Sequence, residues 1–239
     1  MTLEHTVLER LRGGLIVSCQ ARGENPLAGL AFMAAMAQAA ELGGAVGIRA
    51  SGAADIAAIR ARVHCPIIGI DKVWTDGFEV YITPTFAAAG PIAAAGADIV
   101  AVDGTPRPRA QGETLAHLIR RIHDDLGTLV MADASTWEEG VAAAELGADI
   151  VATTMSGYTP YSRQASGPDL EMLRQLARHV DVPIIVEGKI WHPEEVRQAL
   201  DLGAWAVVVG TAITNPLEIT RRFVAAIRGE AYRGPGSGL

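Results

Sequence analysis

Short apolar segments of strand length recur along the chain, separated by segments long enough to form a helix. Eight of them are rich in valine and isoleucine and lack strict polar alternation: residues 14–20, 45–49, 66–72, 99–104, 129–134, 150–154, 183–189 and 206–212. Parallel strands that are buried on both faces have this composition, because neither face meets water. The pattern therefore predicts eight parallel strands.

The intervening segments, such as 55–64, 112–127 and 167–180, carry apolar residues at the three- and four-residue spacing of amphipathic helices. Three similar segments, AAAGADIVAVDG, AAELGADIVATT and ALDLGAWAVVVG, each pass from a helix through glycine into the next strand. Glycine there fits a left-handed helix cap. Pro66 and Pro183 stand at strand entries, where a missing N–H costs little.

Eight such units without a break in composition predict one α/β domain, a (β/α)8 TIM barrel over residues 1–239 with a flexible tail from about residue 229. A doubly wound open sheet is the structural alternative, and the even spacing of the units favours closure. The apolar window 27–48 is rich in alanine and interrupted by Gln38 and Glu41, which favours a core helix leading into a strand over a membrane span.

Composition excludes several classes of protein. The chain has 239 residues, 49% of them hydrophobic, and a formal net charge of −7, with arginines scattered along its length. No basic stripe of the kind that binds nucleic acid is present. The first residues carry charges and lack the pattern of a signal peptide, so we expect a cytoplasmic protein with no nucleic-acid or membrane partner.

Cysteine, histidine and glycine patterns do not indicate a cofactor. Cys19 and Cys65 lie in or beside apolar runs without CxxC or His-Cys spacing, which favours buried reduced thiols. The six histidines fall outside the predicted strand ends and show no ligand spacing. Neither a GxGxxG fingerprint nor a P-loop is present. We therefore expect no metal and no bound nucleotide.

Polar side chains follow almost every predicted strand. In a (β/α)8 barrel the reactive groups gather at the carboxyl ends of the strands. These ends carry Gln20, Arg49, Lys72, Asp103, Asp133, Thr154, Glu187 and the pair Gly210-Thr211. Several charges at one mouth imply mutual pairing or a ligand, because a single buried charge is costly.

Lys72 is the sharpest candidate among them. The chain keeps only two lysines, Lys72 and Lys189, whereas its other eighteen basic residues are arginine. A partly desolvated lysine near Arg49 should have a lowered pKa, and could transfer a proton or form a Schiff base, which arginine cannot do at neutral pH. An ion pair between Lys72 and a carboxylate is the plainer alternative.

The remaining strand ends leave alternatives open. Glu187 could be an acid, a base or an orienter of a substrate hydroxyl, or simply a structural partner of a cation, and Asp103 and Asp133 share this ambiguity. Lys189 should lie on the loop, where it meets an anion or solvent. Glycines after strands seven and eight suit phosphate binding through backbone N–H groups. Gly157 could let the backbone approach a sugar or could only make a turn.

The motifs GGLIVSCQ, AVGIR, PIIGIDK, DGTPRPR, MADAST, TTMSGYT, VEGK and GTAIT, in this order and spacing, resemble the bacterial N-acylglucosamine-6-phosphate 2-epimerases. The resemblance runs from about residue 10 to 228. That family interconverts N-acetylmannosamine 6-phosphate and N-acetylglucosamine 6-phosphate in sialic acid breakdown. The resemblance thus implies an isomerase acting on a phosphorylated amino sugar, without redox cofactor or metal, and small oligomers are common among such enzymes.

The resemblance also implies roles for particular residues. Lys72 matches the family's catalytic base, which removes and returns the C2 proton, and Glu187 matches the carboxylate that assists at the sugar hydroxyls. The polar positions matching substrate contacts are Gln20, Arg49 and Asp133. The phosphate-binding turn is matched by Gly188, Gly210 and Thr211. Lys189 and Asn215 depart from the family pattern, in which arginine is more usual and would help hold the phosphate.

Two other functions remain open from the sequence. A Schiff-base aldolase or lyase on a phosphorylated sugar could use Lys72 as the iminium former. A non-catalytic barrel could bind a sugar phosphate as a sensor or scaffold. Neither the acyl group, acetyl or glycolyl, nor the acceptance of unphosphorylated sugar is specified by the sequence.

Overall fold

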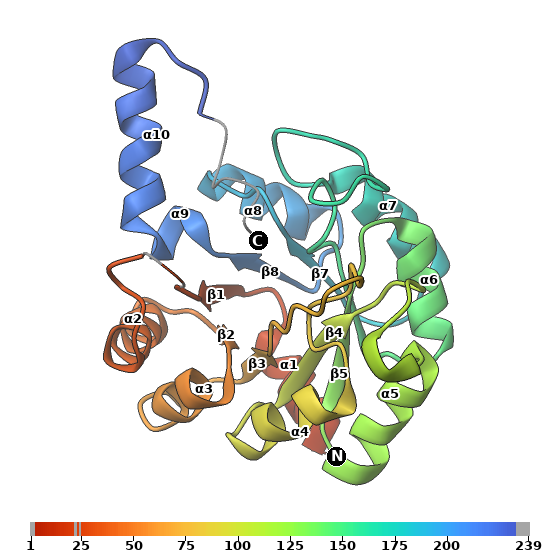
Figure 1. Cartoon of the computed structure of the whole chain (residues 1–239). Coiled ribbons are helices and arrows are strands. Elements are labelled where there is room, and N and C mark those ends of the chain that lie inside the picture. Colours follow the sequence, from red (N-terminus) through yellow and green to blue (C-terminus); the bar gives the residue numbers. More distant parts are fainter. Residues whose placement is uncertain (1–2, 22, 24, 233–239) are drawn as a thin grey trace.

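Eight parallel strands close into a ring, with β1 paired to both β2 and β8 (Figure 1). The computed structural model describes residues 3–21, 23 and 25–232. The strands are β1 (Leu15–Cys19), β2 (Gly47–Ser51), β3 (Ile67–Ile70), β4 (Ile99–Asp103), β5 (Leu129–Asp133), β6 (Ile150–Ala152), β7 (Ile184–Glu187) and β8 (Ala206–Val209). Closure confirms the predicted (β/α)8 TIM barrel and excludes the doubly wound open sheet.

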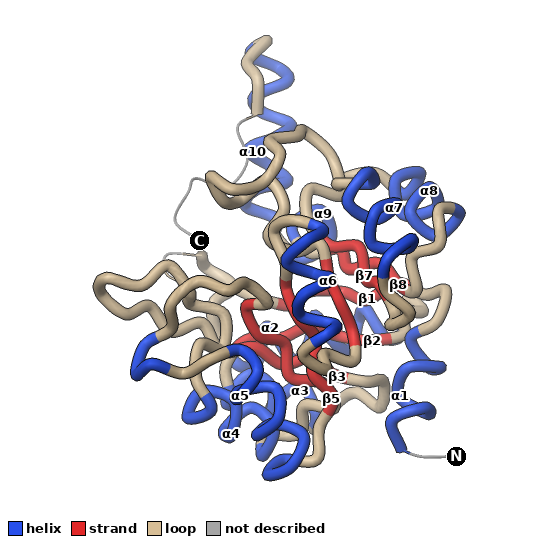
Figure 2. Tube along the Cα trace, turned by 90° about the vertical axis from the view of Figure 1, so that its right-hand side faces the viewer, coloured by secondary structure: helices blue, strands red, loops and turns tan. Residues whose placement is uncertain are grey.

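Helices surround the strands, which occupy the centre of the molecule (Figure 2). They are α1 (Leu3–Leu11), α2 (Leu30–Leu42), α3 (Ala53–Arg60), α4 (Phe86–Ala94), α5 (Leu115–Arg121), α6 (Trp137–Glu145), α7 (Leu170–His179), α8 (Pro193–Asp201), α9 (Thr211–Thr214) and α10 (Pro216–Arg228). A short 3-10 helix, η1 (Ala110–Gly112), precedes α5, and a π-helical segment, η2 (Ile122–Leu126), follows it. The apolar window 27–48 forms α2 and the start of β2, as predicted.

The amino-terminal end of the barrel is closed by α1. Val7 and Leu11 of this helix pack in one cluster with interior residues such as Ile16, and the Trp205 indole N–H donates to the Leu8 carbonyl oxygen at 2.9 Å. The sequence did not reveal this role, because only a few apolar positions of α1 face the barrel and charged residues lie between them. With this end closed, the other end of the barrel is left for a substrate.

The turns from helix to strand share a glycine with positive φ, and two of them also have an aspartate that binds a backbone amide. Gly96, Gly147 and Gly203 have φ values of 103°, 98° and 98°, which confirms the left-handed glycines predicted from the repeated segments. Asp98 and Asp149 follow Gly96 and Gly147 by two residues. Each carboxylate accepts a hydrogen bond from a backbone amide at the start of a neighbouring strand: from Ile67 N at 2.8 Å and from Val130 N at 2.7 Å. These carboxylates satisfy backbone donors at the strand entries.

The last helix, α10, extends away from the barrel (Figure 1). Its base is held by Glu218, which is buried and accepts hydrogen bonds from Arg221 Nη1 at 2.6 Å and from the Tyr232 hydroxyl at 2.8 Å. The Tyr232 ring also contacts Trp191 edge-on, with 5.5 Å between the ring centroids. Of the segment predicted to be a flexible tail, residues 233–239 lie outside the described part of the chain.

Candidate active site

A buried arginine organises the carboxyl end of the barrel. Arg49 projects from the middle of β2 into the barrel and its side chain is only 1% exposed. The prediction that the second strand ends at Arg49 was wrong, since β2 continues to Ser51. Arg49 is nevertheless brought to the mouth, because inward-pointing positions near the end of a strand face the opening of the barrel.

Two carboxylates from neighbouring parts of the ring share the Arg49 guanidinium. Its two Nη atoms donate to Asp133 at 3.0 and 2.5 Å, as a bidentate pair, and Nη1 also lies 2.8 Å from Glu187 Oε2. The Thr154 hydroxyl contacts both carboxylates, at 2.6 Å from Asp133 Oδ1 and 3.3 Å from Glu187 Oε2. Three strands and the loop after β6 therefore contribute to one hydrogen-bonded network, and its bidentate pair suits the planar guanidinium of arginine.

Burial and charge shift the pKa of these groups in a defined way. The pKa of Glu187 is raised to about 7, chiefly by burial; Arg49 and Lys72 oppose the rise, and Asp133 adds to it. Burial alone would lower the pKa of Arg49, but Asp133 and Glu187 more than offset this, so its pKa lies above the ordinary value. Arg49 thus stays charged, whereas Glu187 can exchange a proton near neutral pH.

Lys72 lies just past the end of β3, half-buried, with its backbone paired in an antiparallel bridge to that of Ile82. Its ammonium is near enough to Glu187 to lower the pKa of that carboxyl group. The base candidate and the carboxylate candidate are therefore brought to the same mouth from opposite sides of the ring, as the strand-end pattern predicted.

Gln20 follows β1 on the side of the mouth next to β8. Its Nε2 donates to Ser18 Oγ at 2.9 Å, whereas its Oε1 is buried without a hydrogen-bond partner among the described residues. The Thr214 hydroxyl donates to the Ser18 carbonyl oxygen at 2.7 Å and so ties the turn after β8 to β1. Gly210, which begins this turn, packs so closely on Ser18 that a Cβ atom there would lie 3.3 Å from the Ser18 Cβ.

Lys189 binds backbone of the β6–α7 loop. Its Nζ donates to the carbonyl oxygens of Gly157 at 2.9 Å and of Ala165 at 2.8 Å, and lies 5.2 Å from the centre of the Tyr158 ring. A Cβ atom at Gly157 would come within 2.2 Å of Lys189 Nζ, so glycine is required for this approach. Burial lowers the pKa of Lys189. The close approach at Gly157 is thus made by a lysine of the next loop.

Comparisons with known proteins bear on what this mouth binds. A sequence model of the family described as "Putative N-acetylmannosamine-6-phosphate epimerase" matches residues 33–229. A 2-epimerase of that name from Caldanaerobacter subterraneus subsp. tengcongensis is 51% identical over 231 residues, which is 96% of this chain and 98% of that relative. The chain belongs to the N-acetylmannosamine-6-phosphate 2-epimerase family.

A solved structure of the same family agrees. The N-acetylmannosamine-6-phosphate 2-epimerase from Clostridium perfringens matches with a TM-score of 0.89 and 47% identity, over 92% of this chain and 95% of that one. A thiamine phosphate pyrophosphorylase from Pyrococcus furiosus, with a TM-score of 0.59 and 16% identity, shares the fold alone. The resemblance drawn from the motifs is therefore confirmed, and the protein is an isomerase of the epimerase class.

Within this epimerase the structure separates the two aspartates that the sequence left equivalent. Asp133 belongs to the network around Arg49. Asp103 instead accepts from the backbone amide and the hydroxyl of Thr105, at 2.8 and 2.5 Å, and Arg109 donates to the carbonyl oxygen of Asp103. Asp103 therefore shapes the DGTPRPR loop, and Asp133 faces the mouth.

Some residues of the epimerase mouth were not found from the sequence. Ser18 is buried within β1 and bonds Gln20; its signal was a polar residue inside the apolar run LIVSC. Tyr81 packs against the interior cluster and stacks on Trp74, with 5.4 Å between ring centroids and 5° between ring planes. No local pattern places Tyr81 there, because its position depends on how the loop after β3 folds back.

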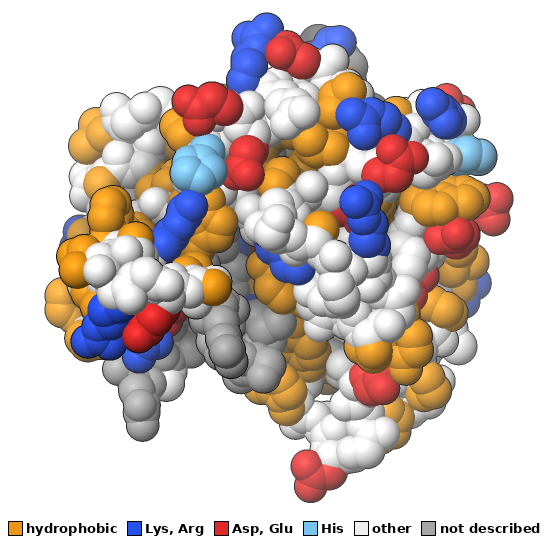
Figure 3. Space-filling view, turned by 90° about the horizontal axis from the view of Figure 1, so that it is seen from above, with side chains coloured by type: hydrophobic (Ala, Val, Ile, Leu, Met, Phe, Trp, Pro, Cys, Tyr) orange, Lys and Arg blue, Asp and Glu red, His pale blue; other side chains and the backbone are white. Residues whose placement is uncertain are grey.

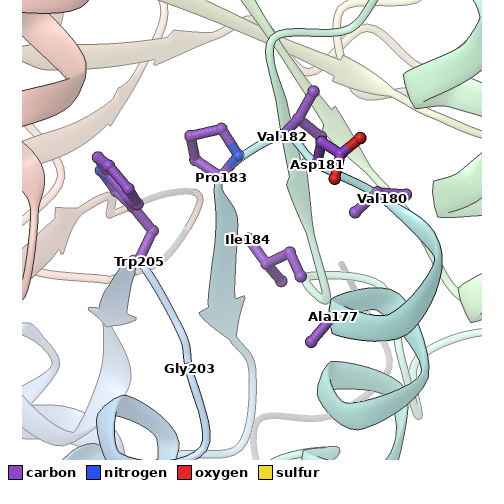
Figure 4. Close-up of a pocket in the computed structure, with 8 residues that line it drawn as sticks. All are labelled: Ala177, Val180, Asp181, Val182, Pro183, Ile184, Gly203 and Trp205. Atoms are coloured by element: carbon purple, nitrogen blue, oxygen red, sulfur yellow. The ribbon is translucent and has the colours of Figure 1, made fainter.

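Other surfaces of the epimerase are less suited to a sugar phosphate. A shallow hollow lies at the opposite end of the barrel, where β7 and β8 begin, and is lined by Ala177, Val180, Asp181, Val182, Pro183, Ile184, Gly203 and Trp205 (Figure 4). On the face seen in Figure 3, acidic and basic side chains lie beside one another in small mixed groups, with hydrophobic and uncharged side chains between them. Within the described residues, the helices are too short or too polar to cross a membrane.

Proposed function

We propose that the barrel mouth interconverts N-acetylmannosamine 6-phosphate and N-acetylglucosamine 6-phosphate by removing and returning the proton on C2. The observation that supports this most directly is that Glu187, paired with the buried Arg49, lies near enough to Lys72 for the ammonium to lower its pKa, in a chain of the 2-epimerase family. The family name supplies the substrate, and the arrangement of charges supplies a means of moving a proton.

The C2 proton of the open-chain sugar is acidic because it lies next to the C1 carbonyl group. We assign its removal to Lys72 as an uncharged amine; the ammonium group so formed would return a proton to the opposite face of C2 once the resulting enolate has turned that face towards it. Proton transfer of this kind is efficient when the pKa of the base lies near the working pH. The proposed step requires neither a redox cofactor nor a metal, and Lys72 forms no bond to carbon.

Arg49 and Glu187 would act together around this step. Because Arg49 stays charged, it provides a fixed positive potential for the negative charge that develops on the enolate oxygen at C1. Glu187, held by Arg49 and Thr154, would exchange a proton with a sugar hydroxyl. Asp133 would keep the guanidinium in place through its bidentate pair.

The substrate contacts are proposed from the remaining mouth residues. Gln20 offers a buried acceptor atom that a substrate N–H or O–H could satisfy. We assign the phosphate group to the backbone of Gly188, Gly210 and Thr211, on the loops after β7 and β8 where barrels often bind phosphate. Gly157 would contribute loop backbone to the rim of the site.

The two departures from the family pattern have other partners in this chain. Lys189 binds two carbonyl oxygens, and Asn215 caps α10 by accepting from Glu218 N at 3.2 Å. Lys189 has three N–H donors, so one remains for a phosphate oxygen. We propose that Lys189 binds the phosphate in addition to the loop, and that Asn215 does not contact it.

We further propose that the enzyme works in the cytoplasm as a homo-oligomer. A phosphorylated sugar is charged and does not cross a lipid bilayer unaided, which places its metabolism inside the cell. Apolar side chains of α10 stand in water in the single chain: Phe223 is 69% exposed and Ile227 86% exposed. A second copy of the chain could cover them.

Proton NMR in deuterium oxide tests the proposed function. The purified protein is mixed with N-acetylmannosamine 6-phosphate, and both the C2 proton signal and the gluco isomer are followed. Loss of the C2 signal together with appearance of the gluco isomer would support the proposal. No change in either signal would reject it; covalent trapping of the substrate by borohydride would then indicate a Schiff base on Lys72, and binding without turnover a sensor.

A further inference from the structure

Lys72 belongs to a hairpin formed by residues 71–83, between β3 and α4. The backbone of Lys72 pairs antiparallel with that of Ile82, and the Val73 amide donates to the Tyr81 carbonyl oxygen at 2.9 Å. Because β3 ends before Lys72, the position of this lysine depends on the returning limb of the hairpin and not on the barrel sheet alone.

The returning limb of the hairpin, residues 79–83, is anchored to the barrel at its inner end but not at its outer end. Val80 and Ile82 are buried, and the Ile82 carbonyl oxygen accepts from the Asp103 amide at 2.9 Å, which joins the limb to β4. Glu79, which begins the limb, has a side chain that is 60% exposed. What holds Glu79 therefore decides how firmly the outer part of the hairpin is held.

Glu79 contacts two side chains from other loops. The Tyr161 hydroxyl, from the loop after β6, donates to Glu79 Oε1 at 3.2 Å. Arg107, from the loop after β4, places its Nε 4.0 Å from Glu79 Oε2 and its guanidinium over the Tyr161 ring at 4.6 Å. The three side chains thus contact one another in a closed triangle, which we call the rim clasp.

The loop after β5 fixes the third member of the rim clasp. Arg107 Nη2 donates to Ser135 Oγ at 2.7 Å and to Glu139 Oε1 at 3.1 Å, and the Arg107 side chain is only 12% exposed. Glu139 is itself held by the capping box of α6 with Thr136. Arg107 is therefore held in one position by the loop after β5 and by α6, and the exposed Glu79 and Tyr161 side chains contact it there.

We propose that Glu79, Arg107 and Tyr161 are positioning residues, which hold the 71–83 hairpin over the barrel mouth and thereby keep Lys72 in place for proton transfer. This inference rests on the proposed function of Lys72. Exposed contacts of this kind add little to the stability of the whole fold. They suit a loop that opens to admit substrate and closes before the chemistry.

The test compares Tyr161→Phe with Tyr232→Phe. The first removes the hydroxyl that binds Glu79 and keeps the ring on Arg107; the second removes a tyrosine hydroxyl that donates to Glu218, at the base of α10 and outside the rim clasp. Measurements are kcat and KM for epimerisation, the thermal midpoint, and the exchange of backbone amide hydrogens in residues 71–83. Glu79→Ala, alone and combined with Tyr161→Phe, completes a double-mutant cycle.

We expect Tyr161→Phe to lower kcat by roughly tenfold, because a misplacement of 1 Å near the chemistry can cost about 100-fold. KM should change little, since the proposed phosphate contacts lie on other loops. Hairpin amides should exchange faster, the thermal midpoint should not move, and the combined variant should be no worse than Glu79→Ala. Tyr232→Phe should leave kcat and hairpin exchange as in the wild type.

Wild-type kcat and wild-type hairpin exchange in Tyr161→Phe would overturn the rim clasp. So would losses that multiply in the combined variant, because two ends of one contact cannot be removed twice. Failure of the proposed function looks different: the unsubstituted protein would then show no C2 exchange with the sugar phosphate, whatever the amides of residues 71–83 do.

Discussion

Arg49 holds two carboxylates at the barrel mouth, and their surroundings make them unequal. Asp133 is fully buried with both oxygens bonded to Arg49, whereas the Glu187 side chain is 14% exposed and shares one guanidinium nitrogen. The first arrangement fixes the arginine, and the second leaves a carboxyl group that can change its protonation state. The residue-scale predictions follow from this difference.

Asp133→Ala should lower the free energy of unfolding by about 3–5 kcal/mol, the usual cost of removing one partner from a buried ion pair, because Glu187 alone contacts only one nitrogen of the buried guanidinium. Urea denaturation measures it. Asp201→Ala, which breaks an exposed pair with Arg197 on α8, serves as the control and should move the unfolding midpoint far less. Equal effects of the two substitutions would show that Asp133 does not support Arg49.

Glu187 should give the enzyme a pH dependence near neutrality. Because burial raises its pKa to about 7, the carboxyl group is largely protonated below that pH and ionised above it. We expect kcat/KM to rise as the pH passes from 6 to 8, since the ionised form accepts a proton from the sugar. In Glu187→Gln the rate should be lower and this rise absent; an unchanged rise would assign it to another group.

Lys72→Ala should lower kcat by roughly 10³-fold or more, because the proposed base is lost. Lys72→Arg should be equally inactive, since arginine keeps the charge but does not deprotonate in this pH range. Both variants should keep the wild-type thermal midpoint and bind the sugar phosphate, as shown by calorimetry. Near-normal turnover in either one would remove Lys72 from the mechanism.

At the scale of elements, the positions of the strands were predictable from the sequence, whereas the end of β2 and the buried charge within it were not. Valine- and isoleucine-rich runs identified every strand, because burial on both faces leaves a composition that needs no tertiary information. The end of β2 was misplaced by two residues, since Arg49 reads as the polar end of an apolar run. A barrel interior accepts a charge there only because Asp133 and Glu187 arrive from distant segments.

The carboxylates and the lysine of the site were also predictable, because parallel strands bring their ends to one mouth. Tyr81 and the rim clasp were not, since they depend on a loop that folds back and on contacts between residues far apart in the sequence, as with Glu79 and Tyr161. The loop contacts of Lys189 and of Asp103 likewise could not be predicted from the sequence. Sequence thus indicated which residues reach the site, and structure showed what holds them.

Close packing under β3 makes a prediction for that element. A Cβ atom on Gly69 would lie 2.8 Å from the Ala97 Cβ and 3.0 Å from Ile56 Cδ1. Gly69→Ala should therefore cost about 1–3 kcal/mol of unfolding free energy through overpacking. Gly167→Ala, whose nearest neighbour would be a Glu195 oxygen at 3.5 Å, is the control and should unfold as the wild type does. Thermal or urea unfolding distinguishes the two.

At the scale of the whole molecule, the apolar side chains on α10 bear on assembly. We expect sedimentation velocity to give a mass above the 25.1 kDa of one chain. Replacing Phe223 and Ile227 by serine should shift the protein towards the single chain, because both side chains lie in water unless another copy covers them. A wild-type protein that sediments as one chain at every concentration would contradict this expectation.

The pairing of β1 with β8 also decides when this chain can begin to work. The register joins Val17 to Val209, so the ring cannot close until β8 has left the ribosome. Contacts between such distant segments form slowly, since the intervening chain must first be ordered. Arg49 likewise has no Glu187 beside it until β7 has joined the ring. We therefore expect no epimerisation by a nascent chain until its last strand has docked.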